Sequence, residues 1–138
     1  MSEGFLLDTC AIIWLANGKP ISSAVVNVLN SLPANGDRLC VSAISAWEIG
    51  MLVSRGKLPS TKHALAWFED FVAASKVVVR DATPGVLVAA SYLPEPLNND
   101  PMDRIIIATA REHDLTIITR DRAILSYGAA GYVRTLAC

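Results

Sequence analysis

Short apolar runs recur along the chain, and segments with helical spacing separate them. The runs do not alternate between apolar and polar residues, which is typical of strands buried on both faces in a parallel sheet covered by helices. We predict strands at residues 5–7, 39–41, 77–79, 115–118 and, as a weaker run, 132–133. Helical spacing is present over residues 9–17, 21–32, 44–55, 61–75, 84–93 and 101–113, with a short turn or helix after Asp121.

This alternation of strand and helix predicts an α/β fold. We expect a three-layer sandwich whose central, mainly parallel sheet has about five strands. One conspicuous loop, residues 93–101, contains Pro94, Pro96, Pro101 and two Asn. The chain has no repeats and no low-complexity tracts, and its length is sufficient to bury a full core, so we expect residues 1–138 to form a single domain.

Composition narrows the class of protein. Hydrophobic residues make up 52% of the chain, yet no apolar run approaches the ~20 residues of a membrane span. The amino terminus, Met1-Ser2-Glu3-Gly4, lacks the basic region of a secretion signal, so we expect a cytoplasmic protein. The formal charge of -1 gives no overall attraction to nucleic acid, so a polynucleotide would have to bind locally. The apolar surplus suggests a self-association or partner surface.

The cysteines give no sign of a metal or disulfide framework. Cys10, Cys40 and Cys138 are odd in number and have no C-x-x-C spacing. Since free cysteine packs readily as a small hydrophobe, we interpret all three as reduced core cysteines.

Four carboxylates fall where predicted strands end or predicted helices begin. Asp8 follows the first strand, Glu48 lies about one turn into a helix, Asp103 opens a helix and Asp121 ends the fourth strand. The carboxyl ends of parallel strands lie along one edge of a sheet, and ligands bind there. We therefore expect these acids to converge.

Helix capping is the simpler interpretation of each acid taken alone. Asp8 and Asp121 each fit an N-cap, whose side chain accepts a hydrogen bond from a free backbone N–H. Ser45-Ala46-Trp47-Glu48 matches a capping box, and Asp100-Pro101-Met102-Asp103 matches an N-cap followed by Pro at N1 and an acid at N3. We interpret Asp100 as a cap rather than a ligand.

Two features favour a joint site over capping alone. In a helix over residues 44–55, Glu48 shares a face with Ile44, Met51 and Leu52, and an ionised carboxylate on an apolar stripe needs a partner. Gathered carboxylates also repel one another unless a cation neutralises them. Oxygen ligands without His or Cys nearby select Mg²⁺ or Mn²⁺ rather than zinc.

Four motifs surround these acids, in order Leu6-Leu7-Asp8-Thr9, Ser42-Ala43-Ile44-Ser45-Ala46-Trp47-Glu48-Ile49, Asp100-Pro101-Met102-Asp103-Arg104-Ile105-Ile106-Ile107-Ala108 and Ile118-Thr119-Arg120-Asp121. Their order and spacing resemble those of PIN-domain nucleases, in particular the VapC-type toxins of bacterial toxin–antitoxin pairs. The resemblance covers nearly the whole chain. Members of the family often have His two residues before the Asp-Pro pair, where this chain has Asn98.

The resemblance implies a PIN-like fold and a metal-dependent endoribonuclease that cleaves RNA through metal-activated water. It implies that Mg²⁺ or Mn²⁺ binds at the catalytic residues Asp8, Glu48, Asp103 and Asp121, with Asp8 and Asp103 as direct ligands. Thr9 and Thr119 would be supporting polar groups. It also implies a homodimer held in check by a small antitoxin that covers the active site.

Three arginines lie next to the acids in sequence: Arg104, Arg120 and Arg122. They are either phosphate contacts or ordinary solvated or salt-bridged arginines.

Three other functions remain to be weighed against a nuclease. A non-catalytic PIN-fold protein that binds RNA or a partner is the alternative. A phosphohydrolase of the D-x-D type is disfavoured because Thr9-Cys10 follows Asp8, which leaves out the second acid. A receiver domain would need an acidic pair and a late lysine that this chain lacks.

Overall fold

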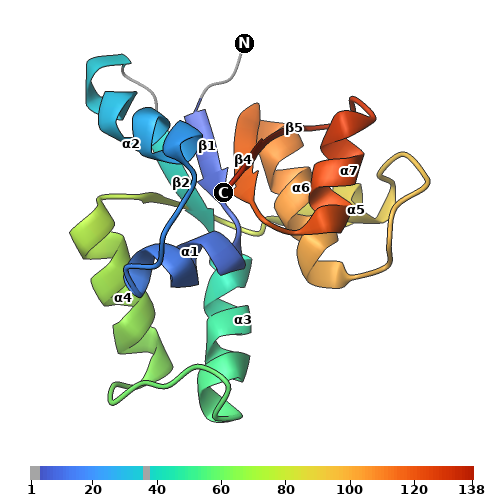
Figure 1. Cartoon of the computed structure of the whole chain (residues 1–138). Helices are drawn as coiled ribbons and strands as arrows, with labels where there is room; N and C mark the ends of the chain where they lie inside the picture. The colour runs from blue at the N-terminus through green and yellow to red at the C-terminus, as the bar shows by residue number, and fades with distance from the viewer. Residues whose placement is uncertain (1–3, 36–37) are drawn as a thin grey trace.

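Five parallel strands form one sheet in the computed structural model (Figure 1), which describes residues 4–35 and 38–138. The interpretation of residues 1–3 as lacking a secretion signal therefore lies outside the described part. The strand order is β3-β2-β1-β4-β5, and every neighbouring pair is parallel. The strands are β1 Gly4–Leu7, β2 Arg38–Ser42, β3 Val78–Arg80, β4 Leu115–Thr119 and β5 Arg134–Ala137. The predicted parallel sheet is confirmed.

Seven helices connect these strands within the described residues. They are α1 Thr9–Ala16, α2 Ser23–Asn35, α3 Ala43–Ser54, α4 Ala64–Ser75, α5 Pro84–Ser91, α6 Pro101–His113 and α7 Arg122–Ala129. Side-chain N-caps begin most of them, namely Asp8, Ser42, His63, Thr83, Asp100 and Asp121. Pro84 and Pro101 follow their caps at N1, where a missing N–H removes no helical hydrogen bond.

Several element boundaries differ from the sequence prediction, and those of α2 and the last strand have a clear local cause. Helix α2 covers residues 23–35 rather than 21–32, because the hydroxyl of Ser22 accepts from the N–H of Val25 and starts the helix there. The last strand was expected at residues 132–133 but begins at Arg134. Tyr132 still belongs to the turn that ends α7, since its N–H donates to the carbonyl of Tyr127.

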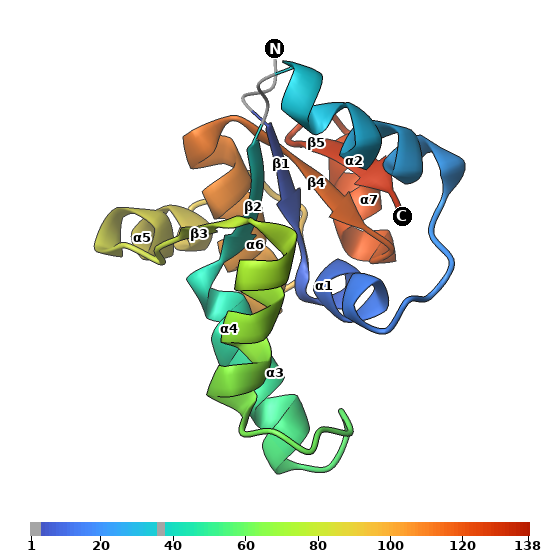
Figure 2. The same ribbon diagram turned by 90° about the vertical axis from the view of Figure 1, so that its left-hand side faces the viewer.

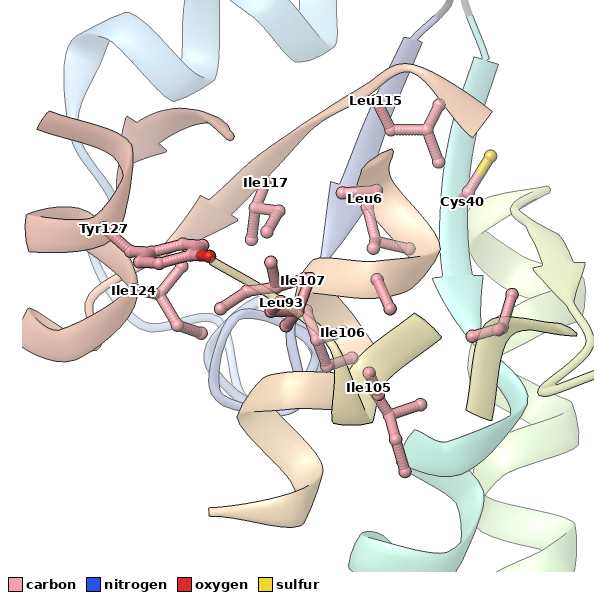
Figure 3. Packing of buried hydrophobic residues seen from close by; sticks show 14 residues of the cluster. Leu6, Cys40, Leu93, Ile105, Ile106, Ile107, Leu115, Ile117, Ile124 and Tyr127 are labelled. Carbon is pink, nitrogen blue, oxygen red and sulfur yellow. The ribbon is translucent and has the colours of Figure 1, made fainter. Parts of the chain in front are cut away.

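Successive residues of the central strands pack on opposite faces of the sheet. One cluster joins the sheet to α5, α6 and α7, and Figure 3 shows its strand residues facing the isoleucines of α6. A second cluster joins the other face to α1, α2, α3 and α4. In each central strand, one residue belongs to the first cluster and the next residue to the second. The first-cluster residues are Leu6, Cys40 and Ile117, and the second-cluster residues are Leu7, Val41 and Ile118. The three-layer sandwich is confirmed, and helices lie on both sides of the sheet in Figure 2.

The strand order reverses beside β1. The chain runs from β1 to β2 to β3 in one direction and then places β4 on the opposite side of β1. Helix α1, which follows β1, packs on one face of the sheet, and α7, which follows β4, packs on the other. The carboxyl ends of β1 and β4 therefore form a topological switch point, the position where open α/β sheets bind ligands.

No helix in residues 4–35 or 38–138 is long and apolar enough to cross a membrane.

Candidate active site

Asp8 lies at the switch point, where β1 ends and α1 begins. It is only 5% exposed, and its backbone N–H donates to the carbonyl of Ile118 on β4 at 3.2 Å. One carboxylate oxygen accepts from the N–H of Ala11 at 2.8 Å, as an N-cap does, and the other accepts from the hydroxyl of Thr119. The buried Thr119 hydroxyl oxygen also accepts from the N–H of Asp121 at 2.9 Å. Thr119 thus connects two of the predicted acids.

Asp121 and Asp103 belong to helices on the opposite face of the sheet from α1. Asp121 caps α7, and its Oδ1 accepts from the N–H of Ile124 at 3.0 Å. Asp103 lies half-buried in the first turn of α6, where its Oδ2 accepts from the side-chain amide of Asn98 at 3.3 Å. Asp100 caps α6, as predicted, and accepts from the N–H groups of residues 102 and 103.

Glu48 is half-buried in the second turn of α3. Ser42, at the end of β2, caps this helix by accepting from the N–H of Ile44 at 3.1 Å. The capping box proposed for Ser45 and Glu48 is therefore wrong, because α3 starts directly after the strand and Ser45 lies inside it. Ser45 is fully buried and accepts instead from the hydroxyl of Thr9 at 2.9 Å.

The hydrogen bond between Thr9 and Ser45 holds the start of α1 against α3. Thr9 follows Asp8 directly, and Ser45 lies three residues before Glu48 on the same side of α3. The bond therefore sets the position of Asp8 relative to Glu48. Sequence reasoning missed Ser45 as a site residue, although its place on the Glu48 face was a usable signal.

The four acids share one electrostatic field. Burial raises the pKa of Asp8 from 3.8 to about 6, and the charges of Asp121 and Glu48 add to the rise. Burial also raises the pKa of Asp103 from 3.8 to about 7, and the charges of Asp121, Asp100 and Asp8 add to the rise. The structure thus brings together Asp8, Glu48, Asp103 and Asp121, as the sequence predicted.

Cys10, the second residue of α1, lies near these acids. Desolvation raises the pKa of its thiol to about 11, and the charges of all four acids add to the rise. Its interpretation as a core cysteine is wrong, because the second position of α1 faces outward and the side chain is exposed. Cys40 is buried and Cys138 half-buried, and all three are free thiols.

The donor set fits a hard divalent cation. Within residues 4–35 and 38–138, no three His, Cys, Asp or Glu side chains form a group that could hold a metal ion by themselves. Mg²⁺ does not need such a group, because one or two carboxylates usually hold it together with waters and substrate phosphates. Asp8 and Asp103 supply such carboxylates, and the neighbouring acids whose charges add to the rise in both pKa values favour a positive charge there.

Arg104 does not point its donors at a substrate. Its side chain is 12% exposed, and its Nε donates to the carbonyl of Asn98 at 2.7 Å. Its two terminal nitrogens donate to the carbonyl of Ala90, the carbonyl of Leu97 and the carboxylate of Glu95. Of the two interpretations left open for Arg104, the structure supports the salt-bridged one: this residue holds the loop that precedes α6.

Arg120 is also committed to structural contacts. It lies over the ring of Trp14 at 3.5 Å and donates to the carbonyls of Cys138 and Pro20 at 2.7 and 2.6 Å. Arg122, by contrast, is an exposed residue at the first position of α7, directly after Asp121. A phosphate contact therefore stays a prediction for Arg122 alone.

Comparison with known proteins agrees with the fold and the motifs. The PIN domain model matches residues 5–129, so the chain belongs to the PIN-domain family. Ribonuclease VapC22 from Mycobacterium tuberculosis (strain ATCC 25618 / H37Rv) is 32% identical over 123 residues, which are 88% of this chain and 90% of that protein. The resemblance to PIN-domain and VapC-type proteins is thereby confirmed.

Solved structures share the fold at lower sequence identity. VapBC2 from Rickettsia felis, bound to a DNA fragment from its promoter, has a TM-score of 0.69 at 17% identity and covers 97% of this chain and 98% of its own. DNA-bound VapBC from Salmonella typhimurium also has a TM-score of 0.69, at 20% identity, and the match covers 99% of this chain and 98% of its own. These similarities support the fold alone.

Proposed function

We propose that this protein is a metal-dependent endoribonuclease and the toxin component of a toxin–antitoxin pair. The convergence of Asp8, Glu48, Asp103 and Asp121 at the β1/β4 switch point is the observation that carries the proposal. Membership of the PIN-domain family and 32% identity to a ribonuclease support an RNA-cleaving nuclease. The family and the site thus point to the same chemistry.

In this proposal, Asp8 and Asp103 hold Mg²⁺ or Mn²⁺, while Glu48 and Asp121 orient the cation and its water ligands. When bound, the cation would activate a water for attack on the RNA phosphodiester and stabilise the leaving oxygen. Thr119 holds the Asp8 carboxylate through its hydroxyl, and Asn98 holds one oxygen of Asp103.

Four helix amino termini support the same location. Helices α1, α3, α6 and α7 all begin at the carboxyl edge of the sheet, directly after or close to the strand ends. The positive dipole ends of these helices favour both carboxylates and a substrate phosphate. Arg122, exposed at the start of α7, would add a further positive charge for the phosphate.

Cleavage of RNA by the purified chain, freed from any bound partner, tests this proposal. We expect cleavage with Mg²⁺ or Mn²⁺, no cleavage in EDTA, and a loss of at least ~100-fold in Asp8→Asn and Asp103→Asn. Asp81→Asn, an exposed acid after β3, is the matched control and should cleave like the unaltered chain. Undiminished cleavage in EDTA or in either site variant would refute the metal mechanism. RNA binding without cleavage would favour the non-catalytic alternative.

A small antitoxin partner and a homodimer belong to the same proposal. Several large apolar side chains are more than half exposed, which supports a surface that a partner covers: Trp47, Leu65, Val88 and Tyr92. A toxin–antitoxin complex from Klebsiella pneumoniae shares the fold, with a TM-score of 0.61 at 18% identity. Light scattering of the chain alone and after co-expression with the adjacent small reading frame would test both partners. We also propose that the protein acts in the cytoplasm.

A further inference from the structure

A groove of about 420 Å³ lies between the loop that precedes α6 and the side of α7. Pro96, Leu97 and Asn98 line it from the loop, and Ser126 lines it from the helix. Tyr127 and Tyr132 complete its wall. No part of the proposed cleavage chemistry uses this groove.

Asn98 links the groove to the acid cluster. Asn98 lines it and also donates its side-chain amide to Oδ2 of Asp103 at 3.3 Å. At the α7 side, the lining begins at Ala123, two residues after Asp121, and ends at Ala130. Since an α-helix rises 1.5 Å per residue, the eight residues from Ala123 to Ala130 span roughly 10 Å. The groove therefore has in its wall a side chain that contacts Asp103, and it is long enough for a nucleotide.

The walls of the groove are fixed before any ligand binds. Arg104 holds the loop through the carbonyls of Leu97 and Asn98 and the carboxylate of Glu95. The hydroxyl of Tyr127 donates to the carbonyl of Pro94 at 2.6 Å and joins the loop to α7. A preformed site loses little conformational entropy when a ligand enters it.

The chemistry of the groove fits a nucleobase better than a phosphate. The rings of Tyr127 and Tyr132 lie 4.9 Å apart and are tilted by 30°, with Tyr127 buried and Tyr132 37% exposed. Arg104 pairs with Glu95 at the rim, and the residues that line the groove include no Lys, Arg or His to attract a phosphate. Aromatic rings stack on bases of any sequence, and a fixed polar side chain can read a base edge.

We propose that this groove binds the base of the nucleotide next to the scissile phosphate, stacked on Tyr132. Asn98 is the residue that would read the edge of that base. Its amide makes one contact to Asp103 and its carbonyl oxygen one contact to the N–H of Asp100, which leaves one donor and one acceptor position. Asn98 thus couples base recognition to the position of a proposed metal ligand. This inference rests on the proposed ribonuclease function.

Steady-state cleavage of a short single-stranded RNA with Mn²⁺, after the cut site has been mapped, tests the proposal. Tyr132→Ala should raise KM by about 10-fold, the loss typical of one base stack, with a smaller change in kcat. Tyr132→Phe keeps the ring and should restore KM. Tyr92→Ala removes a more exposed tyrosine outside the groove and should leave KM unchanged.

Two further measurements separate stacking from a folding defect. For an RNA with an abasic ribose at the flanking position, the KM of the unaltered chain should be higher by a similar factor. With this RNA, Tyr132→Ala should cause no further rise in KM. Ser126→Trp fills the groove from an exposed helical position, and it should also raise KM.

Unchanged KM in both Tyr132→Ala and Ser126→Trp, or additive effects of Tyr132→Ala and the abasic ribose, would overturn the proposal. Weaker binding of a co-expressed protein partner with unchanged KM would overturn it too, since the groove would then serve that partner. If the unaltered chain cleaves no RNA, the proposed function fails separately. Fluorescence anisotropy with the intact and abasic RNAs would then decide whether the groove binds a base.

Discussion

Replacement of Asp8 by Asn should make the folded protein more stable while it removes activity. The Asp8 carboxylate is 5% exposed, and its pKa is raised from 3.8 to about 6, first by burial and then by the neighbouring acids. Between these pH values the folded chain keeps a proton that the unfolded chain has lost. The stability of the unaltered chain therefore falls as the pH rises through this window.

The size of the effect follows from the shift. One pKa unit corresponds to about 1.4 kcal/mol, so a shift of about two units destabilises the folded chain by about 3 kcal/mol at pH 7. Asn carries no charge and removes this penalty. In the unaltered chain, the Asp8 carboxylate accepts a hydrogen bond from the Thr119 hydroxyl. In Asp8→Asn, the side-chain NH₂ would face that hydroxyl, which loses its acceptor at a cost of about 1 kcal/mol. We expect a net gain of about 2 kcal/mol at pH 7 and a net loss of about 0.5 kcal/mol at pH 4, where most of the charge penalty is absent and the hydroxyl cost remains.

Urea unfolding from pH 4 to pH 8 in EDTA measures this difference without interference from divalent cations. Asp81→Asn is the control and should differ from the unaltered chain by less than about 0.5 kcal/mol at every pH. The reasoning is refuted if Asp8→Asn is the less stable protein at pH 7. It is equally refuted if the difference does not change between pH 4 and pH 7.

Three further predictions concern other parts of the molecule. Arg104→Met keeps the apolar stem but removes the hydrogen bonds that hold the loop. The free energy of unfolding measured in urea should therefore fall by about 2 kcal/mol, and an unchanged value would contradict the loop-holding role. Gly128→Ala places a Cβ 2.5 Å from Oγ1 of Thr135 and should destabilise by about 1–3 kcal/mol, whereas Gly50→Ala meets nothing within 4 Å and should stabilise by up to about 1 kcal/mol. The reverse order of their melting temperatures would contradict this packing. In EDTA at pH 8, iodoacetamide should modify Cys10 more slowly in the folded than in the unfolded chain, because desolvation and then the charges of the acids raise the pKa of its thiol to about 11. Equal rates by mass spectrometry would contradict this raised pKa.

Most of the fold could be predicted because the central strands are continuous apolar runs. β1, β2 and β4 are buried on both faces, so burial dictates their composition directly. The edge strand β5 was misplaced because its own residues are only partly buried. The apolar pair before it, Tyr132 and Val133, packs against the core from a turn. Apolar character indicates burial, and it indicates a strand only where the backbone also pairs.

The acids could be predicted because topology places them. Each lies next to a strand end or helix start, and the parallel sheet brings those points to one edge. The side chains that hold the acids could not be predicted in the same way, because their partners are distant in sequence. Thr9 forms a hydrogen bond with Ser45, 36 residues away in the sequence, and Arg120 forms one with Pro20, 100 residues away. A basic residue beside an acid in sequence therefore does not indicate a phosphate contact.

Calorimetric titration with Mn²⁺ at pH 6.5, in buffers of different ionisation enthalpy, tests the central claim most directly. A cation held by Asp8 and Asp103, whose pKa values are about 6 and about 7, must displace the protons that these acids carry. We predict binding with release of about one proton at pH 6.5 and almost none at pH 8.5, and loss of binding in Asp103→Asn. Binding that releases no proton at pH 6.5, or that persists unchanged in both Asp8→Asn and Asp103→Asn, would contradict a metal site at these four acids.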